Sequence, residues 1–306
     1  MDSQNTTSTK LDVYQIVTDR MITLLEQGTA PWQKPWTDSG IPMNLLSKRA
    51  YRGVNLWLLL SLDYERNLFL TWDQIKKLGA SVKQGEHGHV VVFWRTLPKK
   101  KEGDDGEEKK QIPMLRYYKV FNVAQIRDLP ANMVEPIVAG EQDTFLQCEP
   151  IYNMMPQCPD LRHKGQSAYY DPKEDYVNMP GKKTFKKAEG YYATLFHELV
   201  HSTGHEKRLN RPTLTEMAEF GSDMYSIEEL VAELGAAYLS ASTGILERVE
   251  KNSAAYLNGW IAKLKNDKRF IIQASGQAQR AVDFILNRQF PADDPKEVEQ
   301  SELLGE

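Results

Sequence analysis

The sequence predicts an α+β chain of two domains: an N-terminal α+β domain and a C-terminal domain that is mainly helical with a small sheet. The chain has 306 residues, of which 41% are hydrophobic, and this length is enough for two domains. Helical and strand-like patterns both occur before residue 130, whereas the strongest helical patterns follow residue 185. Prolines and glycine interrupt the pattern between these regions. We therefore expect domains at 1–130 and 151–290, a linker at 131–150 and an acidic tail at 291–306.

The N-terminal half is expected to hold three helices and a β-hairpin. The predicted helices lie at 11–27, 53–64 and 72–78, and the predicted strands lie at 89–95 and 114–123. Gly28 is a stop signal for the first helix, and the Thr71 hydroxyl is placed to cap the third. Residues 98–113 carry five lysines and five acidic residues, which predicts a solvated loop between the two strands.

Two amphipathic helices are predicted in the C-terminal half. Apolar residues recur at three- and four-residue spacing from Phe185 to Val200, and Gly204 then provides a stop signal. The second helix is predicted at 226–238, where apolar residues form a stripe along one face. Each helix therefore has a buried face and can present polar side chains at defined positions beside it.

The first of these helices contains the string His-Glu-Leu-Val-His at 197–201. Residues four apart on a helix are separated by about 40° around its axis, so the imidazoles of His197 and His201 share a face. Two imidazoles with a glutamate between them are typical of a zinc site that has a general base beside it. The base would be Glu198. The alternative is a pair of histidines that pack or cap locally without a metal.

A catalytic zinc site needs a third protein ligand. His205 is one candidate, but the pattern that recruits a third histidine downstream would place it where this chain has Lys207. On the second helix, Glu229 and Glu233 are four residues apart and share a face. One can bind the metal while the other accepts a hydrogen bond from a ligand imidazole. Glu228 stays open as a further alternative.

These residues resemble the gluzincin metallopeptidases, in which a glutamate on the next helix joins the two histidines. The resemblance implies that His197, His201 and Glu229 hold one Zn²⁺ per chain and that Glu233 is the carboxylate behind them. It also implies that Glu198 is the catalytic base and that the reaction is hydrolysis, most simply of a peptide bond.

Composition limits the location of the protein. The longest apolar run, at 56–62, is far too short to span a membrane, and residues 1–10 are polar without an apolar signal region. We therefore expect a cytoplasmic protein with no membrane partner. The two cysteines are too few for a disulfide framework, so free thiols are expected.

Charge and tryptophan are unevenly distributed along the chain. Residues 1–130 carry 19 Lys and Arg against 15 Asp and Glu, whereas residues 131–306 carry 19 against 27. Five of the six tryptophans lie in the first part. Basic side chains can neutralise phosphates and flat rings can stack on unpaired bases, as single-stranded nucleic acid requires. The candidate contacts are Trp32, Lys34, Trp36, Lys48, Arg49, Tyr51 and Arg52. The alternative is that the tryptophans are core residues and the charges form a solvated face.

Short motifs along nearly the whole chain resemble the plasmid antirestriction proteins called ArdC. They lie at 31–36, 42–44, 51–55, 71–75, 83–86 and 91–94 in the N-terminal half, and at 197–205, 208–211 and 228–233 in the C-terminal half. The N-terminal half is also similar to part of certain conjugative-plasmid primases. The insertion at 98–113 and the tail at 291–306 lie outside these motifs.

This resemblance implies a plasmid-encoded protein that binds single-stranded DNA through its first domain and protects incoming conjugated DNA from host restriction endonucleases. The second domain is implied to be a zinc-dependent peptidase with an unidentified protein substrate. Two alternatives remain open. One is a regulatory peptidase that cleaves a repressor or a host protein, and the other is a non-enzymatic DNA-binding protein with a structural metal.

Overall fold

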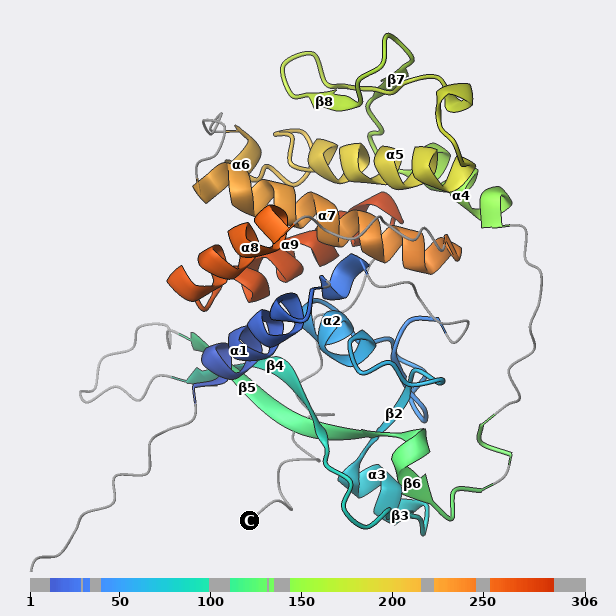
Figure 1. The fold of residues 1–306 in the computed structure, drawn as a ribbon, viewed down its shortest axis with the longest axis vertical. Helices are drawn as coiled ribbons and strands as arrows, with labels where there is room; N and C mark the ends of the chain where they lie inside the picture. Colours follow the sequence, from blue (N-terminus) through green and yellow to red (C-terminus); the bar gives the residue numbers. More distant parts are fainter. Residues whose placement is uncertain are drawn as a thin grey trace, which may run out of the picture.

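The computed structural model describes residues 12–28, 30–33, 40–98, 111–130, 132–134, 144–215, 223–245 and 254–288. Helices of the C-terminal half form one side of the molecule, and a β-sheet of the N-terminal half forms the other (Figure 1). The tail at 291–306 and residues 99–110 of the charged loop lie outside the described residues.

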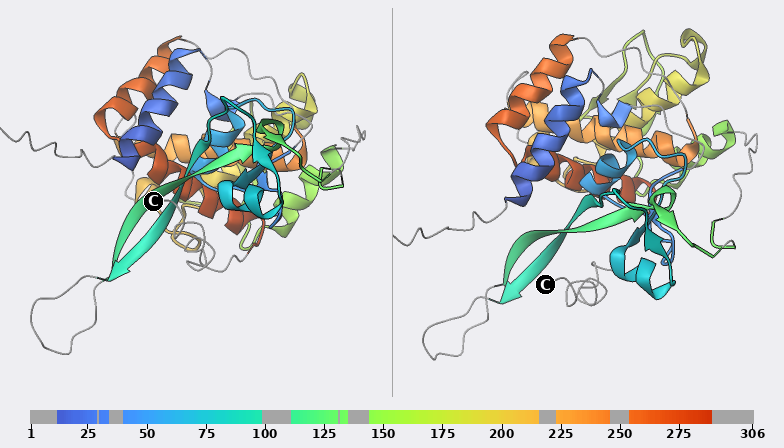
Figure 2. Two further views of the ribbon diagram at one scale, coloured as in Figure 1. Left: turned by 90° about the horizontal axis from the view of Figure 1, so that it is seen from below. Right: turned by 60° about the horizontal axis from the view of Figure 1, so that its bottom comes forward.

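The N-terminal sheet has four strands in the order β1-β2-β5-β4. The strands are β1 (Met43–Asn44), β2 (Leu68–Thr71), β4 (His89–Pro98) and β5 (Gln111–Asn122). The hairpin predicted from the alternating pattern is confirmed, and both of its strands extend further into the charged insertion than predicted. Figure 2 shows this hairpin projecting from the rest of the molecule. A second small sheet pairs β3 (Ser81–Val82) with β6 (Ile126–Arg127).

Three α-helices and two 3₁₀ turns accompany these strands. They are α1 (Val13–Glu26), η1 (Pro31–Gln33), α2 (Val54–Leu60), α3 (Trp72–Lys77) and η2 (Val123–Gln125). Thr71 caps α3 as predicted, since its hydroxyl accepts from the Gln74 N–H while the Gln74 side chain accepts from the Thr71 N–H.

The C-terminal half is mainly helical and carries a three-stranded sheet in the order β7-β9-β8. Its elements are α4 (Thr144–Met154), β7 (Asp160–Arg162), β8 (Tyr169–Asp171), β9 (Tyr176–Asn178), η3 (Lys182–Thr184), α5 (Ala188–Ser202), α6 (Pro212–Thr215), α7 (Asp223–Thr243), α8 (Ala254–Asn266) and α9 (Phe270–Ile285). Helix α4 begins inside the stretch expected to be a linker and packs against α5 and α7.

The largest hydrophobic core contains residues from both halves. Val17 of α1, Trp32 of η1 and Leu56 of α2 belong to the same buried cluster as Val200 of α5 and Leu234 of α7. Two domains would each have a core of their own. Here residues of the N-terminal half form two smaller cores, and the largest core is shared between the halves. Helix α2 is buried at six of its seven positions, so it contacts the sheet on one side and α9 on the other. Figure 1 shows α1 and α2 between the C-terminal helices and the sheet.

Helices α5 and α7 pack closely against each other. Gly235 on α7 faces Val200 on α5, and a Cβ atom at Gly235 would lie 2.7 Å from a Val200 methyl group. This approach sets the distance between the helix that carries the two histidines and the helix that carries the acidic residues. Within the described ranges, no helix combines the length and the apolar character needed to cross a membrane.

Candidate metal centre

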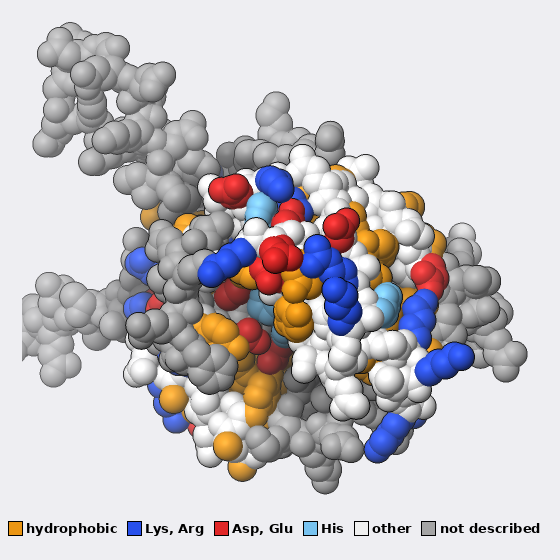
Figure 3. Space-filling view, turned by 90° about the horizontal axis from the view of Figure 1, so that it is seen from above, with side chains coloured by type: hydrophobic (Ala, Val, Ile, Leu, Met, Phe, Trp, Pro, Cys, Tyr) orange, Lys and Arg blue, Asp and Glu red, His pale blue; other side chains and the backbone are white. Residues whose placement is uncertain are grey.

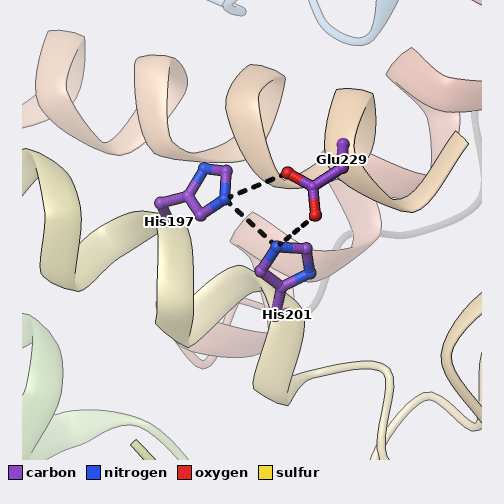
Figure 4. A group of neighbouring side chains, drawn as sticks. All are labelled: His197, His201 and Glu229. Carbon is purple, nitrogen blue, oxygen red and sulfur yellow. Dashed lines mark hydrogen bonds and ion pairs between the residues drawn. The ribbon is translucent and has the colours of Figure 1, made fainter. Parts of the chain in front are cut away.

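Three side chains from α5 and α7 converge on one point (Figure 4). The Nε2 atoms of His197 and His201 are 3.1 Å apart. The Glu229 carboxylate lies opposite them, with Oε2 at 3.7 Å from Nε2 of His197 and Oε1 at 3.6 Å from Nε2 of His201. The spacing of the histidines on one helix and the close packing of α7 produce this arrangement.

The donor set fits a divalent cation. A zinc ion bound tetrahedrally at about 2.1 Å places its ligand atoms about 3.4 Å apart. The two Nε2 atoms are 3.1 Å apart, and they lie 3.6 and 3.7 Å from the two different oxygens of the Glu229 carboxylate. These separations are close to that value. Two imidazoles and one carboxylate are also the ligand types that leave one position open in a catalytic zinc site. His197, His201 and Glu229 are therefore the residues that could hold the metal.

Glu228 orients one of these histidines from behind. Its Oε1 lies 3.2 Å from Nδ1 of His201, on the side of the ring away from the donor cluster. A carboxylate at Nδ1 keeps the proton there and leaves Nε2 available as a ligand. The resemblance to gluzincins implies this role for Glu233, but in the structure Glu228 lies at Nδ1 of His201. The reason is the crossing of α5 and α7, which brings Glu228 beside His201.

A buried arginine completes this arrangement. Arg211 donates from Nε to Oε2 of Glu228 at 3.0 Å and from Nη2 to Oε1 at 2.5 Å. Burial alone would raise the pKa of Glu228, but the hydrogen bonds from His201 and Arg211 lower it to about 2. Glu228 is therefore ionised and fixed in position. Arg211 was part of a resemblance motif, but nothing local in the sequence indicated that it would meet Glu228, 17 residues away.

Glu198 lies beside the metal ligands on α5 and is 8% exposed. Burial raises the pKa of its carboxyl, while the charges of His201 and His197 lower it. Strand β8 packs against α5, so the small sheet lies beside the helix that carries the residue expected to act as the base. A carboxylate with a raised pKa is suited to accept a proton near neutral pH.

His205 is placed in a different cluster. Its Nδ1 lies 3.9 Å from the Asp175 carboxylate and accepts a hydrogen bond from the backbone N–H of Lys207 at 3.2 Å. It is not among the three donors that converge between α5 and α7. Among the candidates for the third ligand, Glu229 is therefore the one that the structure brings to the histidines.

The structure corrects two of the candidate DNA contacts. Trp32 is 2% exposed and Tyr51 is 8% exposed, so no base could stack on either ring. Both rings pack into hydrophobic cores, Trp32 from η1 and Tyr51 from the stretch before α2. Arg52 forms an ion pair with Asp283 of α9. The remaining candidates are Lys48 and Arg49, which are exposed, and Lys34 and Trp36, which lie outside the described residues.

Other rings of the N-terminal half are exposed instead. Trp72, Trp94 and Tyr117 are 47%, 50% and 36% exposed. Sequence pattern alone could not separate these rings from the buried ones, because tryptophan is common in cores and on binding surfaces alike.

The metal centre is accessible from one face of the molecule. Figure 3 shows histidine and acidic side chains gathered in a hollow beside hydrophobic side chains on the face seen from above. His197 and Glu229 keep 26% and 30% of their side-chain surface exposed. A ligand could therefore reach His197 and Glu229 from solvent.

Two known protein families match parts of this chain. The N-terminal domain of anti-restriction factor ArdC matches residues 11–121, and a zincin-like metallopeptidase domain matches residues 154–277. Crystal structures of the antirestriction ArdC protein from plasmid R388 are 37% identical to the chain. The metal-free structure has a TM-score of 0.73 and the Mn(II)-bound structure one of 0.71. The match to the metal-free structure covers 92% of this chain and 100% of the R388 chain.

The chain belongs to the ArdC family of antirestriction proteins.

Two curated relatives extend this comparison. The uncharacterized protein y4eC of Sinorhizobium fredii (strain NBRC 101917 / NGR234) is 33% identical and matches 95% of this chain and 97% of its own. DNA primase TraC of Escherichia coli is 32% identical over 90% of this chain. The matched region is only 27% of the primase, which is a much longer protein. The resemblance stated from the motifs is therefore confirmed at the level of the family and the fold.

Proposed function

We propose that this protein is an antirestriction factor that binds single-stranded DNA and protects incoming conjugated DNA from host restriction endonucleases in the cytoplasm. We also propose that it carries a zinc-dependent peptidase site. Its similarity to ArdC of plasmid R388 over almost the whole chain supports the first part. The convergence of His197, His201 and Glu229 carries the second.

The side chains around the donors suggest how hydrolysis would proceed. When bound, zinc would polarise a carbonyl group and acidify water at the site. Glu198 accepts the proton that the attacking water loses and can pass it to the leaving amine. Glu228 holds the His201 ring from its Nδ1 side. The substrate is proposed to be a protein segment that enters the hollow beside the donors.

Zinc is the proposed metal, and one ion per chain is expected. The R388 relative has a Mn(II)-bound structure, which supports a divalent cation. Two imidazoles and a carboxylate at tetrahedral spacing favour zinc among such cations. Elemental analysis of protein purified without chelators should therefore find about one zinc per chain. His201→Ala should lose it, and Glu198→Gln should retain it. Full retention by His201→Ala would contradict the site.

The exposed rings of the hairpin are the proposed contacts for single-stranded DNA. Trp94 pairs across the strands with Leu115, and Tyr117 and Lys119 follow Leu115 on the same face of β5. Tyr117 and Lys119 are exposed. Rings can stack on unpaired bases, and a lysine beside them can neutralise a phosphate. Single-stranded DNA remains the proposed ligand, and the exposed rings Trp94 and Tyr117 replace the buried rings Trp32 and Tyr51 as its proposed contacts.

Fluorescence anisotropy with labelled oligonucleotides tests the DNA proposal. Trp94→Ala and Tyr117→Ala should each weaken single-strand binding by about 1–3 kcal/mol, and affinity should fall steeply as salt rises. Tyr169→Ala is the matched control, because Tyr169 is an exposed ring in the C-terminal half. Equal losses in all three variants would contradict this placement of the DNA site.

Protection from restriction separates the alternatives. Glu198→Gln removes the base and leaves the three metal donors unchanged. If the variant still protects transferred DNA in a restricting host, DNA binding alone accounts for protection. If protection is lost while DNA affinity is unchanged, cleavage of a host or repressor protein becomes the better explanation.

A further inference from the structure

The carboxylate of Glu233 is held from two sides. Its Oε2 atom accepts a hydrogen bond from the indole N–H of Trp32 at 3.0 Å and another from the Tyr256 hydroxyl. Trp32 lies in η1 of the N-terminal half, Glu233 in α7 and Tyr256 in α8. A segment of the N-terminal half and two consecutive helices of the C-terminal half therefore meet at one oxygen atom.

Packing alone does not explain the choice of tryptophan at this position. Trp32 is 2% exposed and lies in the large core, where another aromatic ring could also fill space. The indole differs from a phenyl ring in carrying one N–H donor and no acceptor. In this structure that donor is used on Glu233, one helical turn from the metal ligand Glu229.

Glu233 lies one helical turn from Glu229, so the two carboxylates are on the same face of α7. Burial raises the pKa of the Glu233 carboxyl, while the hydrogen bonds from Tyr256 and Trp32 lower it and so favour the charged form. Two imidazoles and one carboxylate leave a divalent cation with a net positive charge, which a second carboxylate nearby would balance. The size of this stabilisation depends on the distance between the Glu233 carboxylate and the cation, because Coulomb energy falls with distance. It is larger in a partly buried site than in water.

We propose that Trp32 is a positioning residue of the metal centre. Its indole N–H fixes the Glu233 carboxylate in the orientation that stabilises a cation at His197, His201 and Glu229. The N-terminal half thus contributes to metal affinity in the C-terminal half. This inference rests on the proposed metal site.

Manganese titration of the full-length protein tests the inference. Trp32→Phe keeps a ring in the core and removes the donor, and free Mn(II) is measured by electron paramagnetic resonance. Residues behind the ligands of a metal site commonly contribute 10- to 100-fold to affinity, so we expect Mn(II) to bind roughly 10-fold more weakly. The matched control is Trp57→Phe, which also alters a core tryptophan that is 2% exposed. Its Mn(II) affinity should stay within about twofold of wild type.

A double-mutant cycle separates positioning from a general loss of packing. Glu233→Gln should itself weaken Mn(II) binding, and adding Trp32→Phe to it should change little, because the charge that Trp32 orients is gone. Equal affinities of Trp32→Phe and wild type would overturn the inference, and so would losses that add fully in the double variant. If His201→Ala abolishes binding while Trp32→Phe has no effect, only this inference fails. If wild type binds no Mn(II), the metal site fails with it.

Discussion

Arg208 connects the small sheet to the end of α5. Only 1% of its side chain is exposed, and it donates from Nε to the Ser202 carbonyl at 2.6 Å. Its Nη2 donates to the Tyr170 hydroxyl at 3.0 Å and to the Asp175 carboxylate. Strand β8, which carries Tyr170, also packs against α5. One buried guanidinium therefore links the end of α5 to the sheet beside it.

Replacing Asp175 by Asn should strongly destabilise the protein at neutral pH. Breaking a buried ion pair leaves the remaining charge unpaired and typically costs about 3–5 kcal/mol. Asp175 is 17% exposed and Arg208 is almost completely buried, so a value near the lower end, about 3 kcal/mol, is expected. Urea unfolding of wild type and Asp175→Asn at pH 7 measures this difference. A loss below about 0.5 kcal/mol would contradict the role given to the pair.

The same pair predicts a pH dependence. Burial would raise the pKa of Asp175, but hydrogen bonds from Arg208 and Tyr170 and the Arg208 charge hold it below its ordinary value of 3.8. Because the folded-state pKa is depressed, the stabilisation is fully present above about pH 4 and is lost as the pH falls through the folded-state value. The difference in unfolding free energy between wild type and Asp175→Asn should therefore shrink below about pH 4. Urea titrations from pH 3 to 7 check this, and a constant difference would argue against it.

At the scale of elements, the spacing of α5 and α7 decides the metal centre. His197 and His201 come from one helix and Glu229 from the other, so their separation depends on how closely the helices pack. Gly235 permits this packing, since a Cβ there would lie 2.7 and 2.9 Å from the two Val200 methyl groups. Both helices are buried at this contact, which leaves little room for adjustment.

Gly235→Ala should lower stability and weaken metal binding together. Alanine normally stabilises a helix by about 1 kcal/mol relative to glycine, but overpacking a core costs about 1–3 kcal/mol. The clash with Val200 is well inside contact distance, so we expect a net loss of stability and a wider donor cluster. Thermal unfolding and Mn(II) titration measure the two effects.

Gly259→Ala on α8 is the matched control. No atom lies within 4 Å of a Cβ built at Gly259, so this substitution should be neutral or stabilising and should leave metal affinity unchanged. If Gly235→Ala behaves like the control, the close approach of α5 and α7 does not set the geometry of the site.

At the scale of the whole molecule, the two halves share a core. Helix α1 packs against α8, α2 packs against α9, and η1 packs against α7. Thr18 of α1 also donates to the Lys268 carbonyl at 2.8 Å, and Gly53 donates to the Gln279 side chain at 3.0 Å. The two family domains are therefore joined by buried apolar and polar contacts.

This arrangement predicts one cooperative unfolding transition for the full chain. Separating the halves would expose core residues such as Trp32, Leu56 and Val200, and that exposure is unfavourable in water. Urea unfolding followed by tryptophan fluorescence and by far-ultraviolet circular dichroism should give coincident curves. Residues 1–130 alone should lack a cooperative transition. Two separate transitions in the full chain would show that the halves fold independently.

Local features were predictable from the sequence because neighbouring residues determine them. The helix that carries His197 and His201, the capping of α3 by Thr71 and the β4–β5 hairpin follow from periodicity and short-range hydrogen bonds. Two of the three donors in the metal centre could also be predicted, because residues four apart share a helix face. The choice of Glu229 over Glu233 as the third donor came from the resemblance to gluzincins.

Residue types at short spacing indicate which residues can bind a metal and which family the motifs resemble. The contact of Glu228 with His201, the hydrogen bond from Trp32 to Glu233 and the burial of Tyr51 arise when distant elements pack together. These contacts join residues up to 201 positions apart. The physical reason is that periodicity shows that a face is buried but not what covers it, and that is decided when the helices and the sheet pack together.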